Sequence, residues 1–164
     1  MRKLGAVAVL EVIDALWFAL QPYFPWMIGL LVIVTIARFP PLGRGSWSSK
    51  RDPWRGYRFA ARREVFERAG GRCEAAFFVI WGRCREDAVE ADHVYPWSKG
   101  GATIVSNAQA LCRTHNRSKG AITPPWWYVL GLERRRRTYV QTESTRCVRW
   151  EMSVEDRALR HDRV

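Results

Sequence analysis

The feature that most constrains this chain is a group of four candidate metal ligands. Cys73, Cys84, Cys112 and His115 carry soft or borderline donor atoms, which suit tetrahedral Zn²⁺. Cys112 and His115 have the spacing C-x2-H, so one turn of backbone can direct both at one ion. An alternative is that the cysteines are buried core residues without a metal, but three cysteines with a histidine favour a structural zinc.

The other half of this group has an unusual spacing. Ten residues lie between Cys73 and Cys84, more than in the common C-x2-C arrangement. Because the intervening AAFFVIWG is apolar and β-prone, a short hairpin could bring the two sulfurs together. A core this short rarely supplies more than about 3–5 kcal/mol by itself. A structural zinc can be worth about 10–16 kcal/mol in small metal-folded peptides, so we expect the metal to hold this fold together.

A second set of polar residues is interleaved with the first. Asp92 and His93 end the run AVEADHV, which alternates apolar and polar residues like a half-buried strand. His93 can take a proton from water near pH 7, because the ordinary pKa of histidine lies close to neutrality. Asp92 and Asn116 offer the hard oxygen atoms that Mg²⁺ prefers, and Asn107 can hold a loop through its amide. This set predicts a hydrolytic site.

In their order and spacing these residues resemble the HNH nucleases of the ββα-metal type. The likeness covers about residues 62–120, with two departures: His115 stands where a cysteine is usual, and the first two cysteines are widely spaced. The matching elements are Cys73, Cys84, Asp92-His93, Gly100-Gly101, Asn107 with Leu111-Cys112, and His115-Asn116 with Lys119.

The resemblance implies an α+β fold, a small zinc-stabilised ββα-metal domain. We expect strands at 88–93 and 108–111, a loop at 94–106 and a helix at 113–119. In the roles that the resemblance implies, His93 is the general base, Asn107 positions the loop and His93, and Asp92 and Asn116 hold Mg²⁺ or another divalent cation. The remaining implied roles are structural zinc ligands at Cys73, Cys84, Cys112 and His115, and DNA-binding side chains at Lys99, Arg113, Arg117 and Lys119.

The net charge of +11 is unevenly placed. Residues 1–37 contain two basic and two acidic side chains, so all of the excess lies in residues 38–164. A strongly basic soluble part suits a polyanion such as DNA, or an anionic lipid surface. Cys147 is left over once the zinc ligands are assigned, which favours a reducing compartment over a disulfide framework. We expect no small-molecule cofactor.

The amino-terminal segment predicts a membrane anchor. The 23 residues from Ala15 to Ala37 carry no charge, and as a helix of about 34 Å they would cross a hydrocarbon core of about 30 Å. Glu11 and Asp14 place the centre of any span after them. Three alternatives stay open: a two-helix hairpin with arms 4–21 and 25–38, a soluble core helix, and a cleaved signal peptide, which the two acids disfavour.

Flanking charges predict the orientation of such a span. Six Lys and Arg residues follow it within residues 38–58, whereas only Arg2 and Lys3 precede it. The positive-inside tendency then predicts a single-pass membrane protein whose carboxyl-terminal nuclease domain lies in the cytoplasm.

The whole chain is expected to have four domains: a membrane anchor at 1–38, a basic Pro/Gly/Ser linker at 39–57, the HNH domain at 58–124 and a basic aromatic extension at 125–164. A helix is expected at 59–69, before Gly70-Gly71. Residues 126–130 predict an apolar packing patch, and the arginine run 134–137 predicts a solvated face or one that contacts DNA or lipid. Residues 138–150 predict a pair of strands, and Ser153 predicts the start of a helix that reaches about His161.

Two functions are compatible with this sequence. The first is a membrane-anchored HNH endonuclease that hydrolyses phosphodiester bonds in DNA with a divalent metal ion and a histidine base. The second is a zinc-stabilised, membrane-tethered nucleic-acid-binding module with weak or no cleavage. Because Asp92, His93 and Asn116 are all present, the sequence favours the first.

Overall fold

The computed structural model describes residues 2–40, 51–77 and 81–161. The chain divides into two compact units, Met1–Phe39 and Pro40–Val164, and each is described by itself below.

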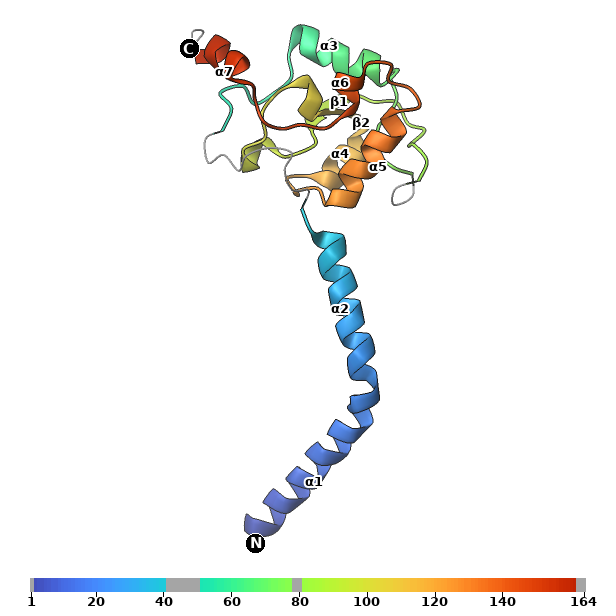
Figure 1. Ribbon diagram of the computed structural model, residues 1–164, viewed down its shortest axis with the longest axis vertical. Coiled ribbons are helices and arrows are strands. Elements are labelled where there is room, and N and C mark those ends of the chain that lie inside the picture. The colour runs from blue at the N-terminus through green and yellow to red at the C-terminus, as the bar shows by residue number, and fades with distance from the viewer. Residues whose placement is uncertain (1, 41–50, 78–80, 162–164) are drawn as a thin grey trace. The chain divides into compact units, whose positions relative to one another are not determined.

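The first unit is helical. It contains α1 (Arg2–Leu20), the short 3-10 helix η1 (Gln21–Tyr23) and α2 (Phe24–Arg38). Its two prolines lie in the first turn of η1 and of α2, where a missing backbone N–H costs little. Figure 1 shows α2 continuing beyond α1 after a bend at η1, not folding back on it as a hairpin would. By length and composition the 28 residues Glu11–Arg38 could cross a membrane. A signal sequence also meets these two criteria.

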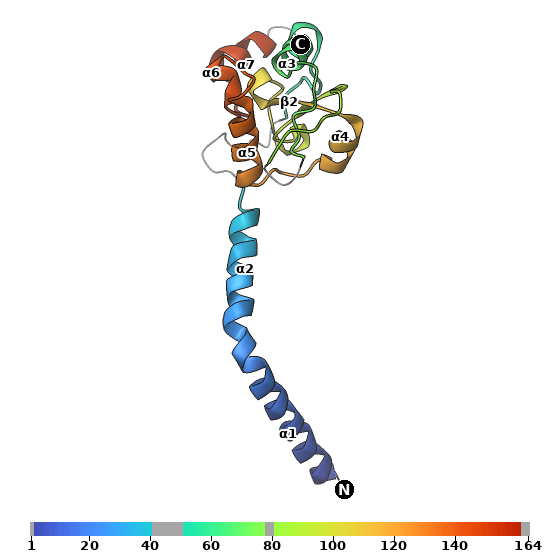
Figure 2. The same ribbon diagram turned by 90° about the vertical axis from the view of Figure 1, so that its right-hand side faces the viewer.

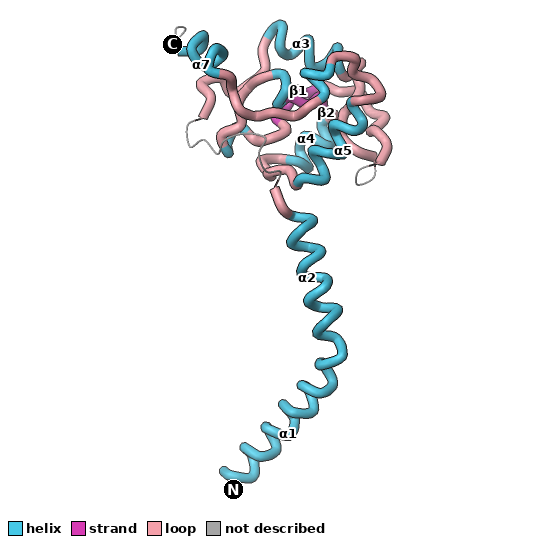
Figure 3. The backbone as a smooth tube through the Cα atoms, viewed as in Figure 1, coloured by secondary structure: helices cyan, strands magenta, loops and turns pink. Residues whose placement is uncertain are grey.

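The second unit surrounds a small sheet. Strands β1 (Glu90–His93) and β2 (Ala108–Leu111) are antiparallel, with Glu90 opposite Leu111 and His93 opposite Ala108. Figure 3 shows how little of this unit is strand and how much is helix and loop. Its helices are α3 (Phe59–Arg68), α4 (Arg113–Lys119), α5 (Trp126–Arg136), α6 (Glu143–Arg146) and α7 (Val154–His161), with 3-10 helices η2 (Trp97–Lys99) and η3 (Val105–Asn107).

The local predictions for the centre of this unit are confirmed. Strand 108–111 and helix 113–119 have the expected bounds, helix 59–69 is one residue shorter, and strand 88–93 starts two residues later. Every residue of β2 is buried. Val65 and Ala69 pack with Ala108 and Ala110 on one face, and Tyr128 of α5 donates to Gln109 on the other. In the view of Figure 2, α4 and α5 lie on opposite sides of β2.

The strand pair expected at 138–150 is wrong. The described chain there contains the single-turn helix α6, and Val148 and Trp150 lie in irregular backbone after it. Apolar alternation in such a short stretch reflects burial of single side chains against a core, which irregular backbone allows as well as a strand does. The helix predicted to begin near Ser153 is present as α7.

Segments before and after the HNH-like part of the sequence, about residues 62–120, complete the core. Val94 and Tyr95, directly after β1, pack with Val129 and Leu132 of α5 and with Trp150. The rings of Tyr95 and Trp150 stack at 4.8 Å. Full burial of a large apolar side chain is worth about 1.5–3 kcal/mol, so the chain around residues 126–150 contributes directly to the stability of the loop that follows β1.

A second cluster reaches back into the segment expected to be a linker. Tyr57 is buried with Val65 and Ala69 around α3 and with Ala108 and Ala110 of β2. Tyr57 therefore packs against the sheet through side chains from α3 and β2, and the residues just before α3 take part in the core.

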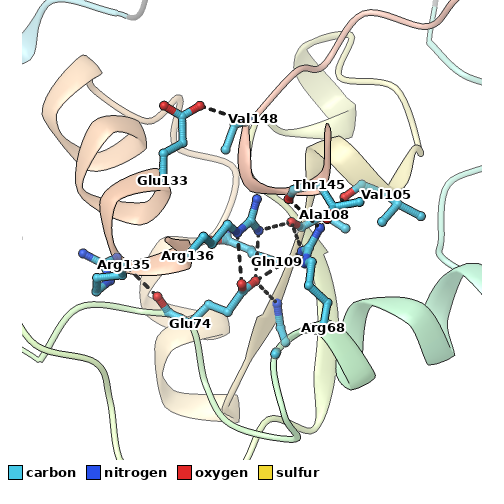
Figure 4. A network of polar contacts seen from close by, with 12 residues as sticks. Arg68, Glu74, Val105, Ala108, Gln109, Glu133, Arg135, Arg136, Thr145 and Val148 are labelled. Carbon is cyan, nitrogen blue, oxygen red and sulfur yellow. Dashed lines mark hydrogen bonds and ion pairs between the residues drawn. The ribbon is translucent and has the colours of Figure 1, made fainter. Parts of the chain in front are cut away.

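A buried ion-pair network joins three elements (Figure 4). Glu74 accepts two hydrogen bonds of 3.0 Å from Arg136 of α5, and Arg68 of α3 lies 3.4 Å away. Tyr139 and the backbone N–H of Ala110 also donate to this carboxylate. Burial alone would raise the pKa of Glu74, but the charges and hydrogen bonds of Arg136 and Arg68 outweigh it and lower the pKa to about 2.

This network corrects the interpretation of the arginine run 134–137. Arg135 and Arg136 are buried, and Arg136 is 0% exposed, so neither is a solvated side chain or a contact for DNA or lipid. Arg134 and Arg137 are exposed. The helical repeat decides the difference: Val129, Leu132 and Arg136 are three or four residues apart and lie on the inward face of α5.

Candidate functional site

The four predicted zinc ligands meet at one point. The donor atoms of Cys73, Cys84, Cys112 and His115 all lie within 4.8 Å of one another, and the three cysteines are buried. Nδ1 of His115 is 3.1 Å from Sγ of Cys112 and 3.6 Å from Sγ of Cys73. A tetrahedral zinc with ordinary bond lengths separates its donor atoms by about 3.5–3.8 Å. The cluster therefore fits the Cys₃His set that the sequence predicts, whereas Cys147 is exposed.

Backbone hydrogen bonds explain how the widely spaced pair converges. The N–H of Cys84 donates to the carbonyl of Ala75, and the N–H of Cys73 donates to that of Glu86, both at 2.9 Å. The chain thus reverses between the two cysteines, as a hairpin would. The tip of the predicted hairpin, residues 78–80, lies outside the described residues.

An acidic face of β1 is turned toward α4. Glu90 and Asp92 are two residues apart in a strand, so their side chains point to the same side. Asn116 of α4 donates a hydrogen bond to Glu90 through Nδ2. Lys119, one turn further along α4, donates to Oδ2 of Asp92 at 2.8 Å. The structure thus places Asp92 and Asn116 on facing elements, each with a different partner.

The donor set on this face suits a hard cation. Glu90, Asp92 and Asn116 all carry oxygen atoms, the ligands that Mg²⁺ prefers. The ammonium of Lys119, a cation, already contacts one of them. Glu90 was not among the predicted site residues. Its position two residues before Asp92 in an alternating strand is the sequence signal that could have identified it.

His93, the last residue of β1, is buried beside this face. Its exposure is 5%, its Nε2 lies 3.0 Å from Oγ1 of Thr103, and its Nδ1 lies 4.0 Å from Oδ1 of Asp92. The ring of Tyr57 packs at 4.7 Å from the imidazole. Burial lowers the pKa of His93 to about 4, although the carboxylate of Asp92 acts in the opposite direction. The imidazole is therefore neutral at pH 7, and a neutral imidazole has a lone pair on one of its two ring nitrogens.

Asn107 joins the two ends of the loop that follows His93. Its Oδ1 accepts from the N–H of Tyr95 at 2.9 Å, and its Nδ2 donates to the carbonyls of Tyr95 and Ala102 at 3.1 and 2.8 Å. The backbone comes so close here that a Cβ on Gly101 would lie 2.1 Å from the Tyr95 carbonyl oxygen. The amide of Asn107 is thus fully used in holding the loop next to His93.

The four predicted DNA-binding side chains differ in their surroundings. Lys99, at the end of η2, and Arg113 and Arg117 of α4 are exposed, so they can reach a phosphate. Lys119 differs, because its side chain is only 12% exposed and is directed at Asp92.

Several residues beside the site had no sequence signal. Asp52 and Thr103 are buried near His93, and Arg160 of α7 reaches them from the far end of the chain. The local sequence around Asp52, Thr103 or Arg160 does not indicate that these three residues contact one another.

Comparison with known proteins agrees with the site. Neither a curated protein nor a solved structure matches the chain. A family model described as HNH endonuclease matches residues 71–121, a segment that contains all four candidate zinc ligands, both strands and α4. The chain therefore carries an HNH endonuclease domain at residues 71–121.

Proposed function

We propose that this protein is a membrane-anchored endonuclease that hydrolyses phosphodiester bonds in DNA with a divalent metal ion. The observation that carries the proposal is the position of His93, a buried neutral imidazole whose Nδ1 lies 4.0 Å from Oδ1 of Asp92. The family match over the same segment supports it, because HNH domains are commonly nucleases.

In the proposed mechanism His93 is the general base. Nδ1 accepts a proton from a water molecule that attacks the phosphorus, and the bond to the leaving sugar oxygen breaks. A divalent ion, when bound, supplies neutralisation of the charge that develops on the phosphate and the leaving oxygen. Asp92 and Asn116 would hold that ion, and Glu90 lies on the same face.

The other residues bind and position. Asn107 keeps the loop after β1 closed on itself, which holds the backbone next to His93 in place. Lys99, Arg113 and Arg117 would contact phosphates of the DNA backbone, and such contacts give affinity without sequence preference. Cys73, Cys84, Cys112 and His115 would hold a structural zinc with no part in the reaction.

One observation favours a second candidate function, a nucleic-acid-binding module without cleavage. Lys119 pairs with Asp92 at 2.8 Å, so the carboxylate that should hold the divalent ion already has a cationic partner. If this pair persists on DNA, the domain binds without cutting.

We further propose that Glu11–Arg38 anchors the protein in a membrane, with residues 40–164 in the cytoplasm. The support is the length and apolar composition of this helix and the excess of Lys and Arg after it. Full-length protein expressed in bacteria should remain with membranes after carbonate washing and should be released by detergent. Recovery in the soluble fraction without detergent would contradict the anchor.

A plasmid-nicking assay tests the enzymatic proposal. Zinc-loaded full-length protein in detergent should nick supercoiled DNA with Mg²⁺ or Mn²⁺ and not with EDTA. His93→Ala should abolish nicking while zinc content and DNA retention stay at the parent level. Asp92→Asn should also abolish it, whereas Asp87→Asn, at an exposed position just before β1, serves as the matched control. Parent protein that retains DNA but never nicks it would support the binding module.

A further inference from the structure

We propose that Thr103 and Asp52 position the imidazole of His93, holding it as the tautomer with its proton on Nε2 so that Nδ1 is the basic atom. This inference rests on the proposed role of His93 as general base. It adds two positioning residues to the site, one from the segment before α3 and one from the loop after β1.

The first step is the hydroxyl of Thr103. A threonine hydroxyl has a single proton to donate, and here Oγ1 donates it to the carbonyl oxygen of Trp54. The contact of 3.0 Å between Oγ1 and Nε2 of His93 must then use a proton on the imidazole. A neutral imidazole carries one N–H, so Nδ1 is left with its lone pair. That atom lies 4.0 Å from Oδ1 of Asp92, on the side where the metal ion is proposed.

The second step is the carboxylate of Asp52, which accepts hydrogen bonds from the backbone of Thr103 and of Trp54, the two residues joined by that hydroxyl's hydrogen bond. Its Oδ2 accepts from the backbone N–H of Thr103 at 2.8 Å, and its Oδ1 accepts from the backbone N–H of Trp54 at 2.9 Å. One side chain therefore sets the distance between the threonine and the carbonyl that receives its proton. Hydrogen bonds to an ionised carboxylate are about twice as strong as neutral ones, so this geometry is stiff.

The third step is the charge partner of Asp52. A buried carboxylate is stable only when it is paired and hydrogen-bonded. Arg160 of α7 supplies the pair: Nη1 contacts Oδ2 of Asp52, and Nη2 donates to the carbonyl of Thr103 at 2.7 Å. The guanidinium also lies 4.5 Å from the ring of Trp54. The carboxyl-terminal helix thus contributes to the position of an imidazole in the HNH domain.

Packing limits the alternatives open to the ring. Tyr57 lies against the imidazole with ring centroids 4.7 Å apart and planes inclined by 40°. If the ring turned over about its Cβ–Cγ bond, Nε2 would leave Thr103 and the hydroxyl oxygen would lose its donor inside a buried site. The observed orientation is the one that satisfies both groups.

Nitrogen NMR tests the tautomer directly. The chain has three histidines, so ¹⁵N-histidine labelling of the full-length, zinc-loaded protein in detergent gives few signals. Long-range proton–nitrogen spectra should show His93 with its proton on Nε2. In Thr103→Val, which keeps the shape and removes the hydroxyl, His93 should shift toward a mixture of tautomers. Thr103→Ser should restore the parent spectrum.

Kinetics test the consequence for the reaction. Thr103→Val should lower kcat for plasmid nicking by about 10–100-fold, the range typical of residues that orient a catalytic group through a hydrogen bond. KM for DNA should stay unchanged, and Thr103→Ser should recover most of kcat. Asp52→Asn keeps an acceptor but loses the charge that pairs with Arg160. Its kcat should lie between those of Thr103→Val and Thr103→Ser. Ser106→Ala is the control. It removes a hydroxyl from the same loop as Thr103, one that donates to the Arg149 carbonyl, and it should leave the His93 spectrum and the nicking rate unchanged.

Two results would overturn the proposal: a parent His93 protonated on Nδ1, or a Thr103→Val protein with the parent tautomer and rate. If Thr103→Val does not fold, the parent and Thr103→Ser spectra still decide the tautomer. A parent protein that never cuts DNA would refute the proposed function, while its spectrum would still report whether Thr103 holds the ring.

Discussion

The ammonium group of Lys119 lies 2.8 Å from the carboxylate of Asp92, which joins the last turn of α4 to β1. The two side chains are 12% and 28% exposed, so solvent weakens the pair only in part. Asp92 is also the residue that we propose as a ligand of the divalent ion. The same carboxylate therefore has two candidate cations, which repel each other when both are close to it.

Removing this competitor should strengthen metal binding. We expect Lys119→Met to bind Mn²⁺ about tenfold more tightly than the parent in the absence of DNA, a gain of about 1.4 kcal/mol. Titration followed by electron paramagnetic resonance on zinc-loaded protein measures the free ion. Arg117→Met, at an exposed position of the same helix, should change the affinity much less, because salt and solvent screen its charge. An unchanged or weaker affinity in Lys119→Met would show that Asp92 does not bind the ion.

Loss of one zinc ligand should unfold the domain. Purified parent protein should contain one zinc per chain, and Cys84→Ser should contain none and lose its cooperative thermal transition. The reason is that a structural zinc is worth about 10–16 kcal/mol in small metal-folded peptides, as much as an ordinary domain has in total. Cys147→Ser is the matched control, since that thiol is exposed and lies outside the cluster. Elemental analysis and circular dichroism measure both quantities, and a Cys84→Ser protein with full zinc content would refute the assignment.

Two neighbouring arginines of α5 should differ sharply in their contribution to stability. Arg136→Met leaves the buried carboxylate of Glu74 without its two-point partner, which should cost about 3–5 kcal/mol. Arg137→Met, one residue later and exposed, should change the free energy of unfolding by less than about 0.5 kcal/mol. Urea unfolding followed by tryptophan fluorescence gives both values. Equal effects would mean that the network around Glu74 does not hold α5 in place.

A methyl group at Gly101 should disturb the loop after β1. Its Cβ would lie 2.1 Å from the carbonyl oxygen of Tyr95 and 2.9 Å from Nδ2 of Asn107, so the backbone must shift. We expect Gly101→Ala to cost about 1–3 kcal/mol of stability, as overpacking does. The nicking rate of Gly101→Ala should fall together with its stability, because the loop borders His93. Gly56→Ala, where a Cβ meets nothing within 4 Å, should behave like the parent in both assays, and a stable, active Gly101→Ala protein would contradict the close approach.

The best predictions from sequence concern segments in which the signal is local. Strand 108–111 and helix 113–119 have the expected bounds, and the ligands spaced C-x2-H converge through one turn of backbone. The helix Glu11–Arg38 follows from an apolar run alone. In each case neighbours a few residues apart decide the structure, so the sequence pattern contains the information.

Apart from the strand pair expected at 138–150, the predictions that failed or were absent concern buried polar side chains. The sequence pattern places Arg136 in a basic run on the surface, whereas the side chain pairs with Glu74, 62 residues away. The sequence pattern places Asp52 in a connecting segment, whereas the side chain pairs with Arg160, 108 residues away. The chain has 27 Lys and Arg residues and 16 Asp and Glu residues, and no local pattern says which of them pair inside the protein.

The sequence by itself determined the candidate metal ligands, the Asp-His pair, the two strands and the helix after them, because these depend on spacing along the chain. Only the tertiary structure decided which nitrogen of His93 faces Asp92, which lysine contacts that carboxylate and which arginines are buried. Those outcomes depend on packing between distant segments, where the cost of burying a charge is met by one particular partner.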